Sequence, residues 1–245
     1  MEVLNFALLL KILTSHFLAD YIFQPPSWSK KKDALGIKSG YFWLHTVIHA
    51  ITLSVLLWDF SLWRVVMLVV AAHFVIDAGK GLFINSIKKK FSSSDKWVFL
   101  SDQFLHLLII VVIWLFYTEQ NQLFGKAVSG LFSEQKNWWL ILGYLSLSIP
   151  SSVLIAKLTQ KLKSKLTHDE GIDGAGKWIG ILERFLIFTF IILNAYSFIG
   201  FLLVSKALFY FWTLKKASDQ KKTEYIINIT LLSFSLAIIA GVIYI

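Results

Sequence analysis

Residues 63–84 read WRVVMLVVAAHFVIDAGKGLFI, an almost uninterrupted apolar run. About 20 such residues are enough for a helix to cross a bilayer, so this stretch predicts a membrane span. His73 and Asp77 lie within it, four residues apart. Residues at that spacing share one face of a helix. The stretch therefore predicts a membrane helix that turns two ligand-type side chains toward the same neighbours.

The composition of the whole chain agrees with a membrane protein. Of its 245 residues 56% are hydrophobic and 16% are charged, and the mean hydropathy is +0.65. A soluble domain carries about 25% charged residues. Further apolar runs lie at residues 3–23, 41–58, 97–117, 138–156, 178–196, 198–214 and 225–244. We predict an all-α, polytopic membrane bundle of eight spans, with seven as the alternative if 178–214 does not break near Ser197–Gly200.

The net charge of +9 comes from lysines in the loops. The loops after the first, third, fifth and seventh runs are basic, which by the positive-inside rule places them in the cytoplasm and the N-terminus outside. Membrane lipids are the expected partners, and nucleic acid is not, because the basic loops contain no nucleic-acid-binding motif. The chain has no cysteine, which excludes disulfides and thiolate metal sites.

The candidate site is a set of four pairs at i,i+4 spacing, one in each of the first four runs: His16/Asp20, His45/His49, His73/Asp77 and Asp102/His106. The predicted topology puts all four at one depth, near the cytoplasmic side. Five imidazoles and three carboxylates suit one or two divalent ions, of which zinc fits best, with manganese or iron as alternatives. We therefore divide the chain into a metal-site half, 1–117, and a C-terminal helical half, 118–245.

Two roles that need no metal stay open for the pairs. A single histidine in a membrane often makes a hydrogen bond between helices, and chains of His and Asp also relay protons or ions. Gln24 and Lys80 extend the faces of Asp20 and Asp77 and are candidates for substrate binding. Gln103 is expected to point away from the site.

A second cluster follows the sequence GAGKWIG at residues 174–180, where Glu183 and Arg184 lie just inside the sixth run. No strand precedes the glycines, so they are not a dinucleotide-binding motif, and a flexible turn is the simpler interpretation. Arg184 can bind a phosphate through two hydrogen bonds. Glu183 can act as a base or an additional ligand. We expect this pair at the depth of the histidine layer.

These residues resemble a bacterial multi-span membrane family catalogued as a domain of unknown function. The resemblance is carried by the motifs HxxxD at 16–20, HxxxH at 45–49, HxxxDxxK at 73–80 and DQxxH at 102–106, and by GxGxWIGxLER at 174–184, and extends over nearly the whole chain. It implies a bacterial inner-membrane protein and no particular reaction. A weaker likeness is to inner-membrane metal-dependent hydrolases, which also place His/Asp pairs in apolar helices.

The sequence thus favours a membrane-embedded metal-dependent hydrolase whose substrate is amphiphilic, lipid-like and phosphate-bearing, taken from the cytoplasmic leaflet. The base would be Asp20, Asp102 or Glu183, and the anionic group would be held by Gln24, Lys80 and Arg184. A transporter or channel for a metal ion or proton is the alternative, and a structural or regulatory subunit is the third. The oligomeric state stays open.

Overall fold

The computed structural model describes residues 6–86, 96–117, 136–164, 166, 174–213 and 220–245. Its elements are all helical over these residues, which confirms the predicted all-α bundle. Two compact units divide the chain, Met1–Leu142 and Gly143–Ile245. The predicted loops around 88–95, 118–135, 167–173 and 214–219 lie outside the described residues.

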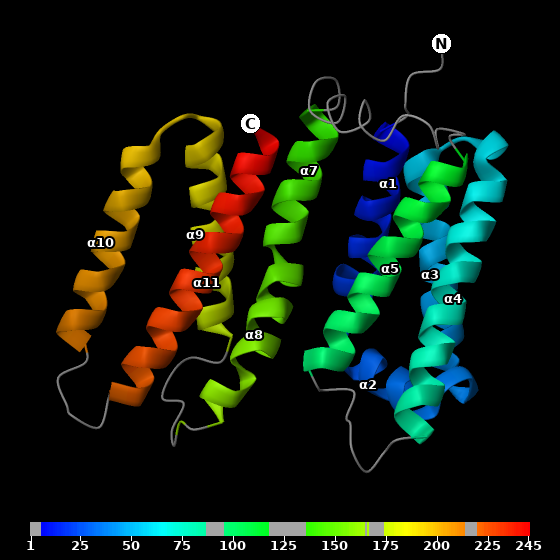
Figure 1. Cartoon of the computed structure of the whole chain (residues 1–245), viewed down its shortest axis with the longest axis horizontal. Coiled ribbons are helices and arrows are strands. Elements are labelled where there is room, and N and C mark those ends of the chain that lie inside the picture. The colour runs from blue at the N-terminus through cyan, green and yellow to red at the C-terminus, as the bar shows by residue number, and fades with distance from the viewer. Residues whose placement is uncertain (1–5, 87–95, 118–135, 165, 167–173, 214–219) are drawn as a thin grey trace. The chain divides into compact units, whose positions relative to one another are not determined.

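The first unit is a closed bundle of four long helices with a short helix across one end (Figure 1). The long helices are α1 Phe6–Phe17, α3 Gly40–Leu57, α4 Trp63–Ser86 and α5 Lys96–Tyr117. Apolar side chains fill the end of the bundle where α1 begins and α5 ends, including Phe6, Leu53, Val65 and Trp114. The opposite end is closed by α2, Pro26–Leu35, which contacts α3 and α4. The polar residues of the four pairs lie between this apolar core and α2.

Helix α2 occupies a segment where a loop was predicted, which corrects the sequence analysis. Pro25 does stop the first helix, but Pro26 then stands at the first position of a new helix, where its fixed φ and missing N–H are tolerated. The two helical segments, Phe6–Ile22 and Pro26–Lys38, meet at 92°. The chain therefore folds back over the end of the bundle, and α2 brings its lysines with it.

The last turn of the first helix is a π-helix, η1 Leu18–Ile22. A π-turn takes an extra residue into the helix and is frequent at functional sites. Asp20 lies in the middle of this turn, so the face that it occupies differs from the one that an uninterrupted α-helix would give it.

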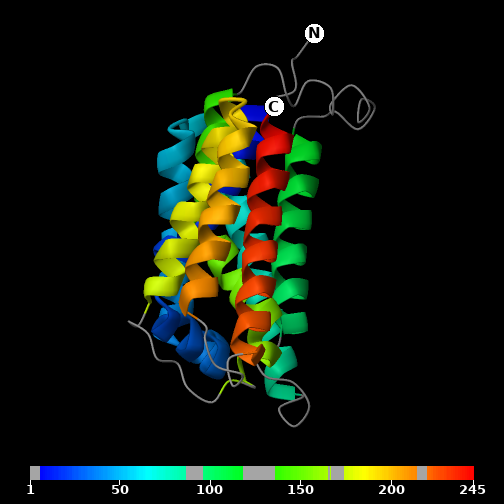
Figure 2. The ribbon, with the colours of Figure 1, turned by 90° about the vertical axis from the view of Figure 1, so that its left-hand side faces the viewer.

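The second unit contains α8 Ile149–Lys163, α9 Ala175–Ile192, α10 Tyr196–Thr213 and α11 Gln220–Tyr244, and it begins inside α7 Lys136–Leu147. Helix α9 packs against both α10 and α11 (Figure 2). The turn between α9 and α10 falls at Asn194, which adopts the left-handed φ of 56°, slightly before the predicted break at Ser197–Gly200. Asparagine tolerates this conformation better than most side chains, which explains the position of the turn.

Five helical segments among the described residues are long and apolar enough to cross a membrane, and six if α1 and α2 form one bent span. The sequence predicted eight. Helix α9 is not among these five segments because it carries three charged residues, Lys177, Glu183 and Arg184. Helix α10 is not among them because its described apolar part, Tyr196–Leu208, is too short to cross a membrane. The outward faces of the first unit are apolar and exposed, for example at Val47, Val55, Met67 and Val75, as expected of helices that contact lipid.

The packing of α11 on α9 depends on a close approach at Gly241. A Cβ there would lie 2.7 Å from Cδ1 and 2.8 Å from Cγ2 of Ile191, which is itself buried. We expect Gly241→Ala to lower the free energy of unfolding by about 1–3 kcal/mol, the usual cost of overpacking. Gly200→Ala is the matched control, because nothing lies within 4 Å of its Cβ. Thermal unfolding in detergent measures both, and equal melting temperatures would contradict this packing.

Candidate metal centre

The four long helices of the first unit bring all four pairs into one cluster. His16, His45, His49, His73 and His106 are between 1% and 5% exposed. Their rings are close neighbours: the ring centroids of His49 and His73 are 3.7 Å apart, and those of His73 and His106 are 4.2 Å apart. The antiparallel packing of neighbouring helices explains the convergence, because each pair lies toward the end of its helix that α2 covers.

The carboxylate of Asp20 lies at the centre of the histidines. Its Oδ1 lies 2.8 Å from Nε2 of His49, 3.3 Å from Nε2 of His73 and 3.4 Å from Nε2 of His45. Its Oδ2 lies 3.9 Å from Nε2 of His16. The π-turn that carries Asp20 therefore points the carboxylate into the bundle.

Three overlapping groups of these residues can hold a metal ion, each with its ligand atoms within 4.8 Å of one another. The first group, which we call group 1, is His16, Asp20, His49 and His73; group 2 is His45, His73 and Asp77; group 3 is Asp77, Asp102 and His106. Group 1 offers three imidazoles and one carboxylate, ligand types that divalent transition-metal ions bind. Together the groups use all eight residues that the sequence predicted as ligands.

Several ligand atoms in the cluster are buried and have no hydrogen-bond partner among the described residues. They are both ring nitrogens of His16, both of His45, Nε2 of His106 and Oδ1 of Asp102. A buried polar atom without a partner costs about 1–3 kcal/mol, so native proteins rarely keep one unless something binds there. A bound cation would use these lone pairs, and this supports the assignment of the cluster as a metal centre.

The tautomer of His106 is fixed by its own helix. Its Nδ1 donates to the backbone carbonyl of Asp102 at 2.8 Å. In a neutral imidazole the other nitrogen then carries the lone pair, so Nε2 of His106 faces the cluster as an acceptor or a ligand.

Two lysines enter the cluster from its α2 side. Nζ of Lys32, on α2, donates to Oδ2 of Asp77 at 2.7 Å, and both residues are buried. Nζ of Lys80 donates to Oδ2 of Asp102 at 3.1 Å and lies 3.4 Å from Oδ1 of Asp33. Lys80 was predicted beside the site, but Lys32 was missed. No spacing in the sequence reveals it, because its position depends on the bend at Pro25.

Gln103 points toward the site, contrary to the expectation from the sequence. Its Nε2 lies 3.5 Å from Oδ2 of Asp20 and 3.4 Å from Oδ2 of Asp102, and its Oε1 accepts from the hydroxyl of Tyr21 at 2.8 Å. Gln103 follows Asp102 on α5 and therefore starts from a different face of the helix, but its side chain is long enough to reach the cluster. Nε2 of Gln24 is buried without a described partner, so Gln24 keeps a free donor.

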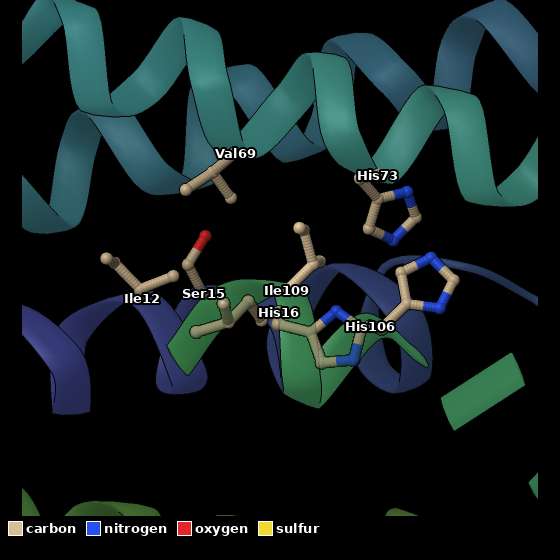
Figure 3. Close-up of a pocket in the computed structure, with 8 residues that line it drawn as sticks. Ile12, Ser15, His16, Val69, His73, His106 and Ile109 are labelled. Carbon is tan, nitrogen blue, oxygen red and sulfur yellow. The ribbon is translucent and has the colours of Figure 1, made fainter. Parts of the chain in front are cut away.

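A small cavity adjoins the histidines on their apolar side (Figure 3). It is about the size of one water molecule, and its lining includes His16, His73 and His106 on one wall and Ile12 and Val69 on the other. The three rings are close together at its edge in Figure 3. The cluster therefore has room beside it for a small ligand such as water.

Glu183 and Arg184 belong to the second unit, where both are bound by protein groups. The guanidinium donates to the carbonyls of Leu147 and Ser148 at 2.7 and 3.1 Å and to Oγ of Ser152 and Ser233 at 2.6 and 3.0 Å. Those two carbonyls lie at the break between α7 and α8.

The Glu183 carboxylate accepts from Nζ of Lys206 at 2.6 Å. These contacts occupy most of the donor sites of Arg184 and one oxygen of Glu183, which supports a structural role for both. The roles of base and phosphate ligand stay predictions.

The structural role of Arg184 has a measurable consequence. Arg184→Leu leaves two buried carbonyls and two serines without their donor, so we expect a loss of about 3 kcal/mol or more in the free energy of unfolding. Arg64→Leu, at an exposed position of α4, is the control. Thermal unfolding in detergent checks both. If Arg184→Leu has the same melting temperature as the wild type and binds inorganic phosphate less well, the predicted anion-binding role of Arg184 is supported instead.

The comparisons with known proteins agree with the family resemblance. A search of curated proteins and a search of solved structures each found no match. The family described as "Protein of unknown function (DUF3307)" matches residues 8–135. This range contains all four pairs and ends before α7, so it is shorter than the resemblance seen in the sequence. Because the match covers more than half of the chain, the protein belongs to this family of unknown function.

Proposed function

We propose that this protein is a membrane-embedded metal-dependent hydrolase that acts on an amphiphilic, phosphate-bearing, lipid-like substrate. The observation that carries the proposal is group 1, in which three histidines and one aspartate from three different helices place four ligand atoms within 4.8 Å. Burial of ionisable groups inside an apolar bundle costs free energy, so such groups usually belong to a functional site. The mixture of imidazole and carboxylate favours zinc, with manganese or iron as alternatives.

A divalent ion held by these four ligand atoms would need a fifth position, open to water or substrate, to polarise a phosphoryl oxygen and to lower the pKa of a bound water toward 7. The chain supplies a base beside it. Oδ1 of Asp102 is buried, with no hydrogen-bond partner among the described residues and Nδ1 of His106 3.7 Å away, while the Gln103 amide nitrogen lies near Oδ2 of both Asp102 and Asp20. Asp102 is thus close to the ligand Asp20 and has a free oxygen to accept a proton. We assign Asp102 as the general base and Asp20 as a ligand.

The anionic part of the substrate would be held on the α2 side of the cluster. Lys80 presents an ammonium group there and is more exposed than the histidines, with a side chain 15% accessible. The unpaired amide nitrogen of Gln24 is a second donor for phosphate oxygens. The apolar tail would remain in lipid, along the exposed faces of the bundle. The basic loops predict that this end faces the cytoplasm.

Metal content gives the first test of this proposal. We expect the purified protein to retain zinc, or to take it up after addition and desalting, and the variant with His49→Ala and His73→Ala to lose at least nine-tenths of it. His168→Ala is the matched control, because His168 lies outside the four pairs. Elemental analysis of purified protein measures the ratio. A wild-type protein that holds no metal after reconstitution would refute the metal centre.

Turnover gives the second test and separates the hydrolase from a transporter. We expect the zinc-loaded protein to release phosphate or a headgroup from a library of lipid phosphates in mixed micelles. Asp102→Asn should reduce the rate by at least 100-fold, as expected of a general base, while the metal content stays unchanged. Zinc or proton flux into liposomes without any turnover would instead support the transport alternative.

A further inference from the structure

We infer that the cluster holds a single metal ion in group 1, and that the ammonium group of Lys32 occupies the position that a second ion would take beside Asp77. The inference rests on the proposed metal-dependent function and goes beyond it, because it decides between one ion and two. It also gives different roles to two carboxylates that the sequence places in equivalent i,i+4 pairs.

Asp77 is the residue that the second and third groups share. Its Oδ2 is 3.6 Å from Nε2 of His45 and 3.6 Å from Nδ1 of His73, and its Oδ1 is 3.9 Å from Nε2 of His106. Nζ of Lys32 already lies 2.7 Å from Oδ2. A second metal ion in group 2 would bind this oxygen beside a buried positive charge, and the two cations would repel each other.

The other carboxylate of the third group, Asp102, also has an ammonium group beside it, although its Oδ1 keeps no hydrogen-bond partner among the described residues. Oδ2 of Asp102 accepts from Nζ of Lys80 at 3.1 Å. Asp20 differs from both, since the described residues place only histidines within ion-pair distance of it. Both ring nitrogens of His16, in group 1, are buried without a hydrogen-bond partner among the described residues, as are atoms of His45, Asp102 and His106 in the other two groups. What distinguishes group 1 is therefore its carboxylate, which has no lysine partner among the described residues.

The net charge of the cluster also favours one divalent ion over two. Metal-binding histidines are neutral, so the fixed charges are those of the carboxylates Asp20, Asp33, Asp77 and Asp102 and of the two lysines Lys32 and Lys80. Four negative charges exceed two positive charges by two. One divalent ion makes this buried set neutral, whereas two ions would leave it with two uncompensated positive charges, which burial disfavours.

The arrangement also explains how α2 is held on the bundle. Of the lysines on α2, Lys32 is buried, whereas Lys30 and Lys31 are exposed. The buried ion pair of Lys32 with Asp77 attaches α2 to α4, which closes the end of the cluster that carries Lys80 and Asp33. Lys32 is thus a positioning residue: it neutralises Asp77 and fixes α2, and it does not touch the proposed metal.

The roles of the two carboxylates can be separated by matched variants of the full-length protein. We expect one zinc per chain in the wild type, one in Asp77→Asn, and a loss of at least ten-fold in zinc affinity in Asp20→Asn. Elemental analysis and competition with a zinc chelator measure these values. Two zinc ions in the wild type, or loss of the bound zinc in Asp77→Asn, would overturn the single-ion arrangement. A wild type with no zinc would refute the proposed function instead.

The role of Lys32 is tested by removing its charge. Lys32→Met removes the ammonium partner of Asp77 and makes the net charge of the cluster more negative by one. We therefore expect the zinc content to rise from one toward two per chain. Lys30→Met, on the exposed side of α2, should stay at one. A folded Lys32→Met variant that still binds one zinc would show that Lys32 does not occupy the second position. If this variant does not fold, the comparison of Asp20→Asn with Asp77→Asn decides.

Discussion

The carboxylate of Asp20, surrounded by imidazoles inside an apolar bundle, is the group on which the first unit depends. Its contacts with His45, His49 and His73 join three helices at one point. In an apolar environment such a group needs positive charge or many hydrogen bonds, since burial of an unpaired charge is very costly. The requirement explains why ligand-type residues from four helices meet here, and why Gln103 also turns toward Asp20.

The other carboxylates of the cluster satisfy the same requirement in a different way. Asp77 and Asp102 are paired with Lys32 and Lys80, so protein cations compensate them. Lys32 reaches Asp77 because Pro25 and the following helix α2 turn the chain back over the bundle at 92°. The bend, which follows the first ligand pair by only a few residues, is thus part of the site. Closure of this end by α2 also limits access to the partly exposed side where Lys80 lies.

Much of this arrangement could be predicted from the sequence, and the limits have physical causes. The i,i+4 spacing fixes which residues share a helix face, and antiparallel spans bring pairs at one depth together, so the eight residues of the four pairs were found. Lys32 and Gln103 were missed because their positions depend on a chain reversal and on side-chain reach, which leave no periodic signal. For Arg184 two roles stay open from the sequence, because a buried arginine in an apolar run indicates either a ligand site or a helix break. Only the contacts with Leu147 and Ser148 distinguish the two.

The central claim is that one divalent ion is bound by His16, Asp20, His49 and His73. Anomalous scattering from crystals of the zinc-loaded protein, recorded on both sides of the zinc edge, tests it most directly. The account predicts a single anomalous peak within about 2.0–2.2 Å of three histidine nitrogens and one Asp20 oxygen. A peak bound by Asp77 or Asp102, two peaks in the cluster, or no peak there at full zinc loading would contradict it.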